Sequence, residues 1–266
     1  NDDGWPDLAV ANDGERDLLY QNNGDGTFTE KGTELGMAYG ENGEARAGMG
    51  SDAGIVDSSG QPSAFVGNFS NEMIGVYRYS GKGWFNDRAA LSRIGRTSYL
   101  SLTFGLFLFD VDLDTDLDLF FANGHLNSVS VVNRQFNLLF ENDGRGRYTD
   151  ISEKSGLLAS GKRIHRSAIF ADYDDDGMVD IFVTVNGQQV EDGQGNNIFD
   201  PHQGKGILFH NETKGDNNWI KVRLEGTKSN RDGFGSTVSI TVGTIKQKQA
   251  LVSGQGYFSS HAKEIY

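Results

Sequence analysis

The 266-residue sequence contains no cysteine, only three prolines and no long run of apolar residues. The absence of cysteine excludes disulfides, thiolate metal sites and thiol nucleophiles. No apolar stretch approaches the roughly 20 residues that a spanning helix needs, so we expect no membrane span. Basic residues are also few, with 24 Lys and Arg against 37 Asp and Glu. The net charge of −13 disfavours nucleic acid and anionic membranes as partners and favours cations.

Glycine and acidic residues are abundant instead, and many of them recur in an internal repeat. Four segments share a short polar turn that leads into an apolar run, for example D-D-D-G-M-V-D-I-F-V-T-V from Asp174. The turns align on Gly4, Gly60, Thr115 and Gly177. The resulting period of 55 to 62 residues indicates repeated structural units.

A second element recurs in phase with the first. It reads L-L-Y-Q-N-N-G-D-G-T-F from Leu18, has equivalents from Gly75 and Leu138, and ends with a shortened copy from Ile207. An aromatic-rich run, a glycine turn and another aromatic residue are typical of a β-hairpin. The apolar runs are short and bounded by turn residues, and no long stretch has a helical period, so we predict an all-β fold.

A unit of 55 to 62 residues with several short strands fits a blade of a β-propeller, and an array of β-sandwiches is the competing architecture. Residues 1–213 hold between three and four units, whereas closed propellers usually have about four to eight blades. We therefore expect an incomplete set of blades in this chain, with others before Asn1. From Asp216 onward polar and apolar residues alternate, which predicts a separate small β module over 214–266.

The most acidic turn has the pattern D-x-D-x-D-G-x-x-D from Asp172. Oxygen atoms at alternate positions converge as such a loop wraps round, and calcium takes six to eight oxygen ligands. An EF-hand would need Glu at position twelve, where this sequence has Val183. The loop closes instead on Asp180 at position nine and runs into a predicted strand. Magnesium is a poorer match because it tends to keep its waters.

Three of the four turns carry this pattern, in whole or in part. We predict two to three structural calcium ions, one for each of these loops. The predicted ligands are Asp172, Asp174, Asp176, Met178 and Asp180; Asp110, Asp112, Asp114, Asp116 and Asp118; and Asn1, Asp3, Trp5 and Asp7. The opposing interpretation is that Asp and Gly cluster only because turns favour them. Repetition and the mutual repulsion of four carboxylates within nine residues favour a bound cation.

Two departures from the pattern are informative. The second unit has Ile55, Asp57, Ser59 and Ser63 at the ligand positions, so we predict that it holds no ion. In the third unit Thr115 replaces the glycine, which makes a positive φ angle costly and weakens the prediction for that loop.

The repeats resemble a known family. F-A-D-Y-D-D-D-G-M-V-D-I-F-V from Phe170 and Y-Q-N-N-G-D-G-T-F from Tyr20 resemble the VCBS/FG-GAP repeats of integrin-α-like β-propellers. W-I-K-V-R-L-E-G-T-K-S-N-R-D-G-F-G-S from Trp219 and S-G-Q-G-Y from Ser253 resemble the ASPIC/UnbV module of proteins similar to cartilage acidic protein. The resemblance implies a secreted or cell-surface propeller with calcium in the acidic loops, and it implies no particular activity.

Catalytic motifs are absent from the sequence. The five histidines form no metal or catalytic spacing, His125 being the best placed, and no G-x-S-x-G occurs. We therefore expect no enzyme, but an extracellular scaffold for adhesion to a protein or glycan. The alternative is a propeller enzyme of the lyase or dehydratase type that acts on carbohydrate in the channel, where His and carboxylates would converge. A self-assembling surface-layer or filament subunit is a third possibility.

Overall fold

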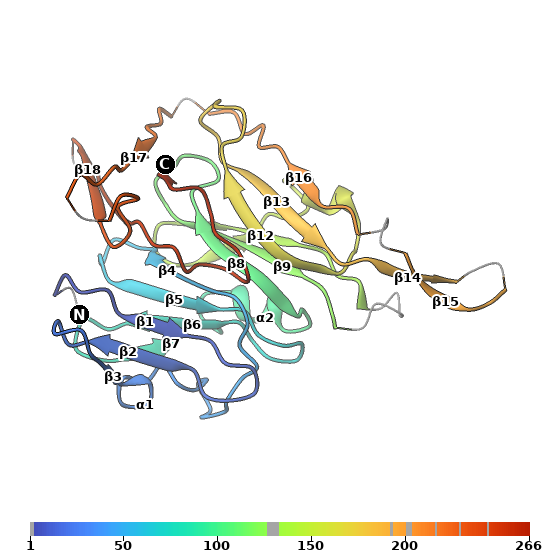
Figure 1. The fold of residues 1–266 in the computed structure, drawn as a ribbon, viewed down its shortest axis with the longest axis horizontal. Helices are drawn as coiled ribbons and strands as arrows, with labels where there is room; N and C mark the ends of the chain where they lie inside the picture. The colour runs from blue at the N-terminus through green and yellow to red at the C-terminus, as the bar shows by residue number, and fades with distance from the viewer. Residues whose placement is uncertain are drawn as a thin grey trace.

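The computed structural model describes residues 3–126, 133–191, 194–200, 204–215, 217–228, 230–243 and 245–266. Within these ranges nearly all regular structure is β-strand, arranged in small sheets whose paired strands are all antiparallel (Figure 1). The prediction of an all-β fold is confirmed. No helix of the described residues is long and apolar enough to span a bilayer.

Four sheets follow one another along the chain, one for each repeat. The first holds β1 (Leu8–Val10), β2 (Leu18–Asn22) and β3 (Phe28–Glu30). The second holds β4 (Ser51–Ile55), β5 (Pro62–Val66), β6 (Gly75–Tyr79) and β7 (Phe85–Asp87). The third holds β8 (Thr103–Phe109), β9 (Asp118–Asn123), β10 (Leu138–Asn142) and β11 (Tyr148–Asp150). The fourth holds β12 (His165–Ala171), β13 (Asp180–Val185) and β16 (Ile207–Phe209).

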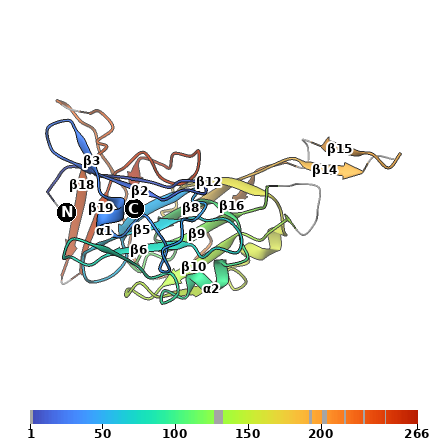
Figure 2. The same cartoon turned by 90° about the horizontal axis from the view of Figure 1, so that it is seen from below.

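Shorter elements connect and follow these sheets. One short helix follows the last strand of each of the first three sheets: α1 (Gly32–Leu35), α2 (Ile94–Ser98) and η2 (Leu157–Ser160). The hairpin of β14 (Gln188–Glu191) and β15 (Asn197–Asp200) projects from the fourth sheet (Figure 1, Figure 2). Near the C-terminus β17 (Val222–Arg223) pairs with β20 (Glu264–Ile265), and β18 (Thr237–Val242) pairs with β19 (Ile245–Ala250). The β18–β19 pair lies at the opposite end of the molecule from β14–β15 (Figure 2).

The hydrophobic core explains how the sheets stack. Every residue of β8 and β9 is buried, and successive side chains of a strand point to opposite faces. Leu106 and Leu108 pack in one cluster with Phe65 of the second sheet, whereas Phe107 packs in another with Phe170 of the fourth. The third sheet is therefore enclosed between its two neighbours, as a blade is in a propeller. No closed ring forms within the described ranges.

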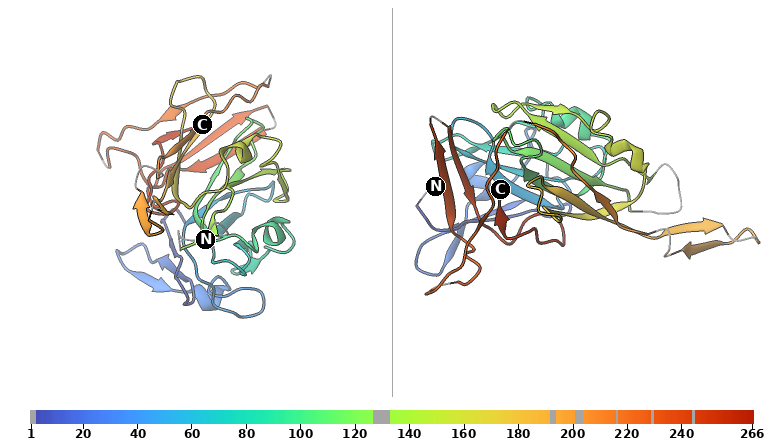
Figure 3. Two further views of the ribbon diagram at one scale, coloured as in Figure 1. Left: turned by 90° about the vertical axis from the view of Figure 1, so that its right-hand side faces the viewer. Right: turned by 90° about the horizontal axis from the view of Figure 1, so that it is seen from above.

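Residues 255–261, here termed the C-terminal strap, cross the first strands of three sheets. Gly256 exchanges two backbone hydrogen bonds with Ser51 of β4, at 2.8 and 3.3 Å. The Tyr257 ring meets Phe104 of β8 edge-on at 5.0 Å. The His261 ring stacks on Phe170 of β12 at 4.3 Å. The strap therefore ties the second, third and fourth sheets together, and the two views in Figure 3 show the C-terminal segment close to them.

Candidate metal centres

The four predicted loops have one local structure, whatever their acid content. In the second, third and fourth units the loop joins the first and second strands of the sheet, and in the first unit it precedes β1. In each loop the backbone N–H at position seven donates a hydrogen bond to the side-chain oxygen at position five. The donors are Trp5, Gln61, Asp116 and Met178, at 2.8 to 3.2 Å from their acceptors. The hydrogen-bonded turn is therefore common to all four units and does not depend on how many acidic residues the loop contains.

Position six has a positive φ angle in all four loops. Gly4, Gly60 and Gly177 have φ angles of 86°, 69° and 91° there, and Thr115 has 81°. A residue with a side chain is strained at a positive φ angle, so the backbone strain that we expected at Thr115 is present. The third loop keeps the common backbone in spite of that strain.

Each acidic loop is fastened to the sheet by an asparagine of the hairpin. The backbone N–H groups of Asn22, Asn142 and Asn211 donate to the position-nine carboxylates of Asp7, Asp118 and Asp180, at 2.8 to 2.9 Å. Their side-chain amides donate to the carbonyl of position eight, at 3.1 to 3.3 Å. Our sequence interpretation missed these residues. The signal was available, because Y-Q-N, F-E-N and F-H-N recur in phase with the loops.

The third loop gathers one buried carboxylate, that of Asp118, and two half-buried ones, those of Asp110 and Asp112. Ligand atoms of Asp110, Asp112 and Asp118 all lie within 4.8 Å of one another. Burial raises the pKa of Asp110 to about 6 and that of Asp118 to about 8. Burial also raises the pKa of Asp112, and the neighbouring carboxylate of Asp114 adds to the effect. The oxygen Oδ1 of Asp112 is buried without a hydrogen-bond partner.

In the part of the chain that the structure describes, no basic side chain offsets the negative charge of the third loop. Within the described ranges no Lys, Arg or His forms an ion pair with an acid of the third loop. The charged side chains that the hairpin brings to this loop are acidic too: the carboxylate of Glu141 repels Asp112, and that of Asp143 repels Asp116. A partly buried group of like charges that includes a buried oxygen without a hydrogen-bond partner favours a bound cation or protonation. The residues present fit an all-oxygen cation site.

The fourth loop contains similar acids, but two basic side chains meet them. The Nζ of Lys221 lies 2.7 Å from Oδ2 of the buried Asp172 and 2.5 Å from Oδ1 of Asp175. The Nδ1 of His210 lies 3.0 Å from Oδ1 of Asp180. These hydrogen bonds raise the pKa of Lys221 and of His210. Two overlapping groups here could also hold a metal: Asp172, Asp174 and Asp176; and Asp174, Asp180 and His210.

In the second unit an arginine side chain supplies a positive charge next to the loop. Asp57 is the single carboxylate at its ligand positions, and its buried side chain forms an ion pair with the guanidinium of Arg78. Arg78 is paired in register with Ser63, the position-nine residue of this loop. Its positive charge lies where a metal ion would otherwise be needed. Our prediction that this unit holds no ion stays a prediction, and the ion pair supports it.

The first loop is described in part, because Asn1 lies outside the described residues. Asp3 accepts the Trp5 N–H at 2.9 Å, and Asp7 accepts the Asn22 N–H at 2.9 Å. These contacts match those of the third and fourth loops. The turn is therefore formed, while its full set of predicted ligands stays a prediction.

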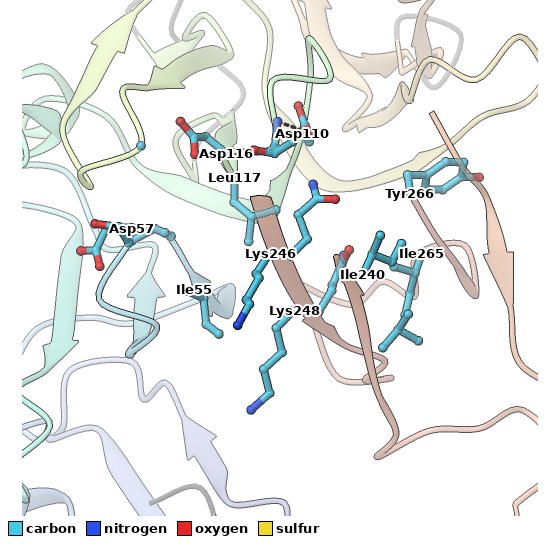
Figure 4. Close-up of a pocket in the computed structure, with 17 residues that line it drawn as sticks. Ile55, Asp57, Asp110, Asp116, Leu117, Ile240, Lys246, Lys248, Ile265 and Tyr266 are labelled. Carbon is cyan, nitrogen blue, oxygen red and sulfur yellow. Dashed lines mark hydrogen bonds between the residues drawn. The ribbon is translucent and has the colours of Figure 1, made fainter. Parts of the chain in front are cut away.

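A groove opens between the third loop and the β18–β19 hairpin (Figure 4). Its volume is about 240 Å³, and it is lined by Asp110 and Asp116 from the loop and by Lys246 from β19. Leu117 and Ile240 supply apolar surface between these charges. Figure 4 shows the two acids at one end and the amine of Lys246 pointing away from them. The groove combines both signs of charge with an apolar surface.

The first strands of the sheets carry few groups suited to catalysis. His165 at the start of β12 is buried, its Nδ1 lies 2.8 Å from the Asn123 carbonyl, and burial lowers its pKa to about 4. His261 of the strap is half-buried, and loss of solvent around its ring lowers its pKa to about 4. His125 packs edge-on against Phe69 at 5.2 Å. In the described ranges the groups that could hold a metal lie around the third and fourth loops, away from these three histidines.

Parts of the chain are similar to known protein families and to a solved structure. The family model of the FG-GAP-like repeat matches residues 1–49 and 110–183, and that of ASPIC and UnbV matches residues 226–266. No curated protein matches. Among solved structures, a lectin from Agrocybe aegerita, described as recognising non-reducing terminal N-acetylglucosamine, matches with 17% identity and a TM-score of 0.36. That match covers 79% of this chain and 50% of the lectin chain, so this chain spans about half of the lectin's length. Our chain therefore contains FG-GAP-like repeats in a nearly all-β fold and an ASPIC and UnbV segment at its C-terminus.

Proposed function

We propose that this chain is part of a calcium-stabilised β-propeller that lies outside the cell or at its surface. In this proposal it serves as a non-enzymatic scaffold that binds a protein or a glycan. The FG-GAP-like repeats and the ASPIC and UnbV segment support the architecture. Calcium binding, the location outside the cell or at its surface, and the scaffold role are what we propose beyond these matches.

The observation that carries the proposal is the third loop. Carboxylate oxygens of the half-buried Asp110 and Asp112 and of the buried Asp118 lie within 4.8 Å of one another, and one buried oxygen of Asp112 has no donor. Calcium prefers carboxylate and carbonyl oxygens, and a loop of this length supplies several of them. Asp114 and Asp116 would complete the set. Bound calcium would neutralise the loop and hold β8 and β9 in their relative positions.

The non-enzymatic part is supported by what covers the first strands of the sheets. The strap lies across β4, β8 and β12, and its His261 stacks on Phe170 with a pKa far below neutrality. Asp52 of β4 is occupied by hydrogen bonds from Leu108 N–H and from Gln255 of the strap, each at 2.8 Å. These groups hold the sheets together, which is a structural role.

The groove of Figure 4 is our candidate for the ligand surface. It borders the third loop, so calcium bound there would fix one of its walls. An acidic and a basic wall with apolar residues between them suit a protein segment or a polar glycan.

A binding assay in the presence and absence of calcium tests the proposal. The purified chain is applied to arrays of glycans and of extracellular proteins, with calcium or with a chelator, while thermal unfolding and bound metal are measured in parallel. We expect calcium to raise the melting temperature and a ligand to be retained only with calcium. An unchanged melting temperature together with no bound metal would rule out the calcium scaffold. Turnover of a carbohydrate substrate would rule out the non-enzymatic role.

A further inference from the structure

One hairpin residue faces position nine of the loop in every unit. The registers Leu8↔Tyr20, Ser63↔Arg78, Leu119↔Phe140 and Ile181↔Phe209 establish the equivalence. The facing residues are Gln21, Arg78, Glu141 and His210. Arg78 pairs with Asp57, Glu141 acts on Asp112, and His210 contacts Asp180. The same place in the repeat therefore carries a fixed cation, a carboxylate or an imidazole.

In the fourth unit the imidazole meets two carboxylates. The Nδ1 of His210 lies 3.0 Å from Oδ1 of Asp180 and 3.9 Å from Oδ2 of Asp174. A zinc ion binds N and O ligands at about 2.0 to 2.2 Å, so two ligands of one ion lie roughly 2.9 to 4.3 Å apart. Both separations fall within this range. The ligand atoms of all three side chains lie within 4.8 Å of one another, close enough to reach a single ion.

Neighbouring groups hold these side chains in place. Asp180 also accepts the backbone N–H groups of Asn211 at 2.8 Å and of Tyr173 at 3.1 Å. The Tyr173 ring packs edge-on against the His210 ring at 5.6 Å. Contacts of this kind orient metal ligands before the ion arrives.

A second feature of the loop works against calcium. Asp172, the position-one acid, is engaged by the ammonium of Lys221 at 2.7 Å. An all-oxygen calcium site of six to eight ligands needs that carboxylate. The remaining side-chain donors are the carboxylates of Asp174, Asp176 and Asp180 and the ring nitrogen of His210. A set that includes a ring nitrogen suits zinc and its neighbours better than calcium.

We propose that Asp174, Asp180 and His210 form a site for a late first-row transition-metal ion, with Zn²⁺ as the probe of choice. The site differs from the third loop in its nitrogen ligand and does not depend on calcium binding there. It makes the fourth unit selective for a softer ion than the third.

The test is equilibrium dialysis of the whole chain against Zn²⁺ in a large excess of Ca²⁺, with elemental analysis of the retained metal. The wild type is expected to retain one zinc, and H210Q to bind it at least tenfold more weakly. The matched control H125Q, which changes a histidine outside the site, is expected to bind like the wild type. X-ray absorption of the zinc-loaded wild type is expected to show an imidazole ligand.

A glutamate in place of His210 would give the fourth unit the residue that the third unit has at the equivalent position, Glu141. H210E is therefore expected to lose zinc preference and to gain calcium affinity. Equal zinc affinity in H210Q and the wild type would overturn the proposal, as would the absence of retained zinc in the wild type. Far-UV circular dichroism and calcium binding by the third loop report whether each variant has folded, so a loss of zinc through unfolding is recognised. Zinc retention without calcium binding would leave this site intact and contradict the calcium scaffold alone.

Discussion

The third and fourth loops share a backbone and differ in what surrounds their acids. Both have a positive φ angle of 61° at position four, at Leu113 and Asp175, and a second one at position six. Both are fastened by an asparagine to the position-nine carboxylate. The third loop faces Glu141 and has no basic partner in the described ranges, whereas the fourth meets Lys221 and His210.

Because of this difference, the third loop needs a bound cation more than the fourth, whereas the sequence motif alone implies the opposite order. The fourth loop has the complete D-x-D-x-D-G pattern and the third has a threonine at the glycine position. Yet part of the fourth loop's charge is already balanced by side chains from distant segments, while that of the third is not. The demand for a cation therefore depends on the whole local charge, and a linear motif reports only part of it.

The largest expected difference between the loops is their response to pH. Asp118 has a folded-state pKa of about 8, above its unfolded value of 3.8, so the metal-free protein loses stability as the pH rises from about 4 to about 8. Calcium must displace the proton, so its affinity for the third loop is expected to rise on the order of 100-fold between pH 6 and pH 8. Calcium titrations at several pH values measure this. A pH-independent affinity would show that Asp118 is ionised before calcium binds.

Removal of the lysine is expected to make the fourth loop more like the third. Lys221→Met frees Asp172 and should raise calcium affinity at the fourth loop by about tenfold, or roughly 1.4 kcal/mol. Lys263→Met, which removes a lysine paired with Asp232 at 2.8 Å, is the control and should have no effect on calcium. Calorimetric titration of both variants, each with the third loop disabled by Asp112→Asn, isolates the effect. Equal affinity in the two variants would mean that Lys221 does not compete with the ion.

Replacement of the threonine is expected to make the third loop more like the fourth. Thr115→Gly removes a side chain at a φ angle of 81° and should stabilise the protein by about 0.5 to 1 kcal/mol. Thr149→Gly, in the middle of β11, should have the opposite sign because glycine weakens a strand. Denaturant unfolding in the presence of a chelator measures both. A destabilised Thr115→Gly variant would show that the threonine contributes more than its strain costs.

The smallest effect on calcium binding is expected in the second unit. Arg78→Gln removes the partner of the buried Asp57 and should cost about 1 kcal/mol. No calcium site should appear, because Ile55, Ser59 and Ser63 offer no carboxylate. Thermal unfolding with and without calcium checks both statements. A gain of calcium-dependent stability would show that one carboxylate in this turn is sufficient for binding.

Much of the fold was predictable because it is encoded locally. Short apolar runs bounded by turn residues, glycine turns and the 55 to 62 residue period predicted the all-β fold and its hairpins. The turn at Thr115 was predicted to be strained, and its φ angle is positive. Each of these features depends on residues within a few positions of one another.

The charge environment of the loops was not predictable in the same way. Lys221 reaches Asp172 from the segment that follows the repeats, and Arg78 reaches Asp57 across a sheet. The strap likewise meets Asp52 through Gln255, far along the chain. Such contacts depend on how separate units stack, which no short motif records. The boundary between 1–213 and 214–266 stays a prediction.

Calcium titration of three proteins tests the central claim most directly: the wild type, Asp112→Asn and Asp174→Asn, compared by isothermal calorimetry at pH 8. Asp112 contributes the unpaired oxygen of the third loop, and Asp174 is its counterpart in the fourth. We expect the tightest calcium binding to be lost in Asp112→Asn and kept in Asp174→Asn. Tight binding that survives in Asp112→Asn and disappears in Asp174→Asn would contradict the account.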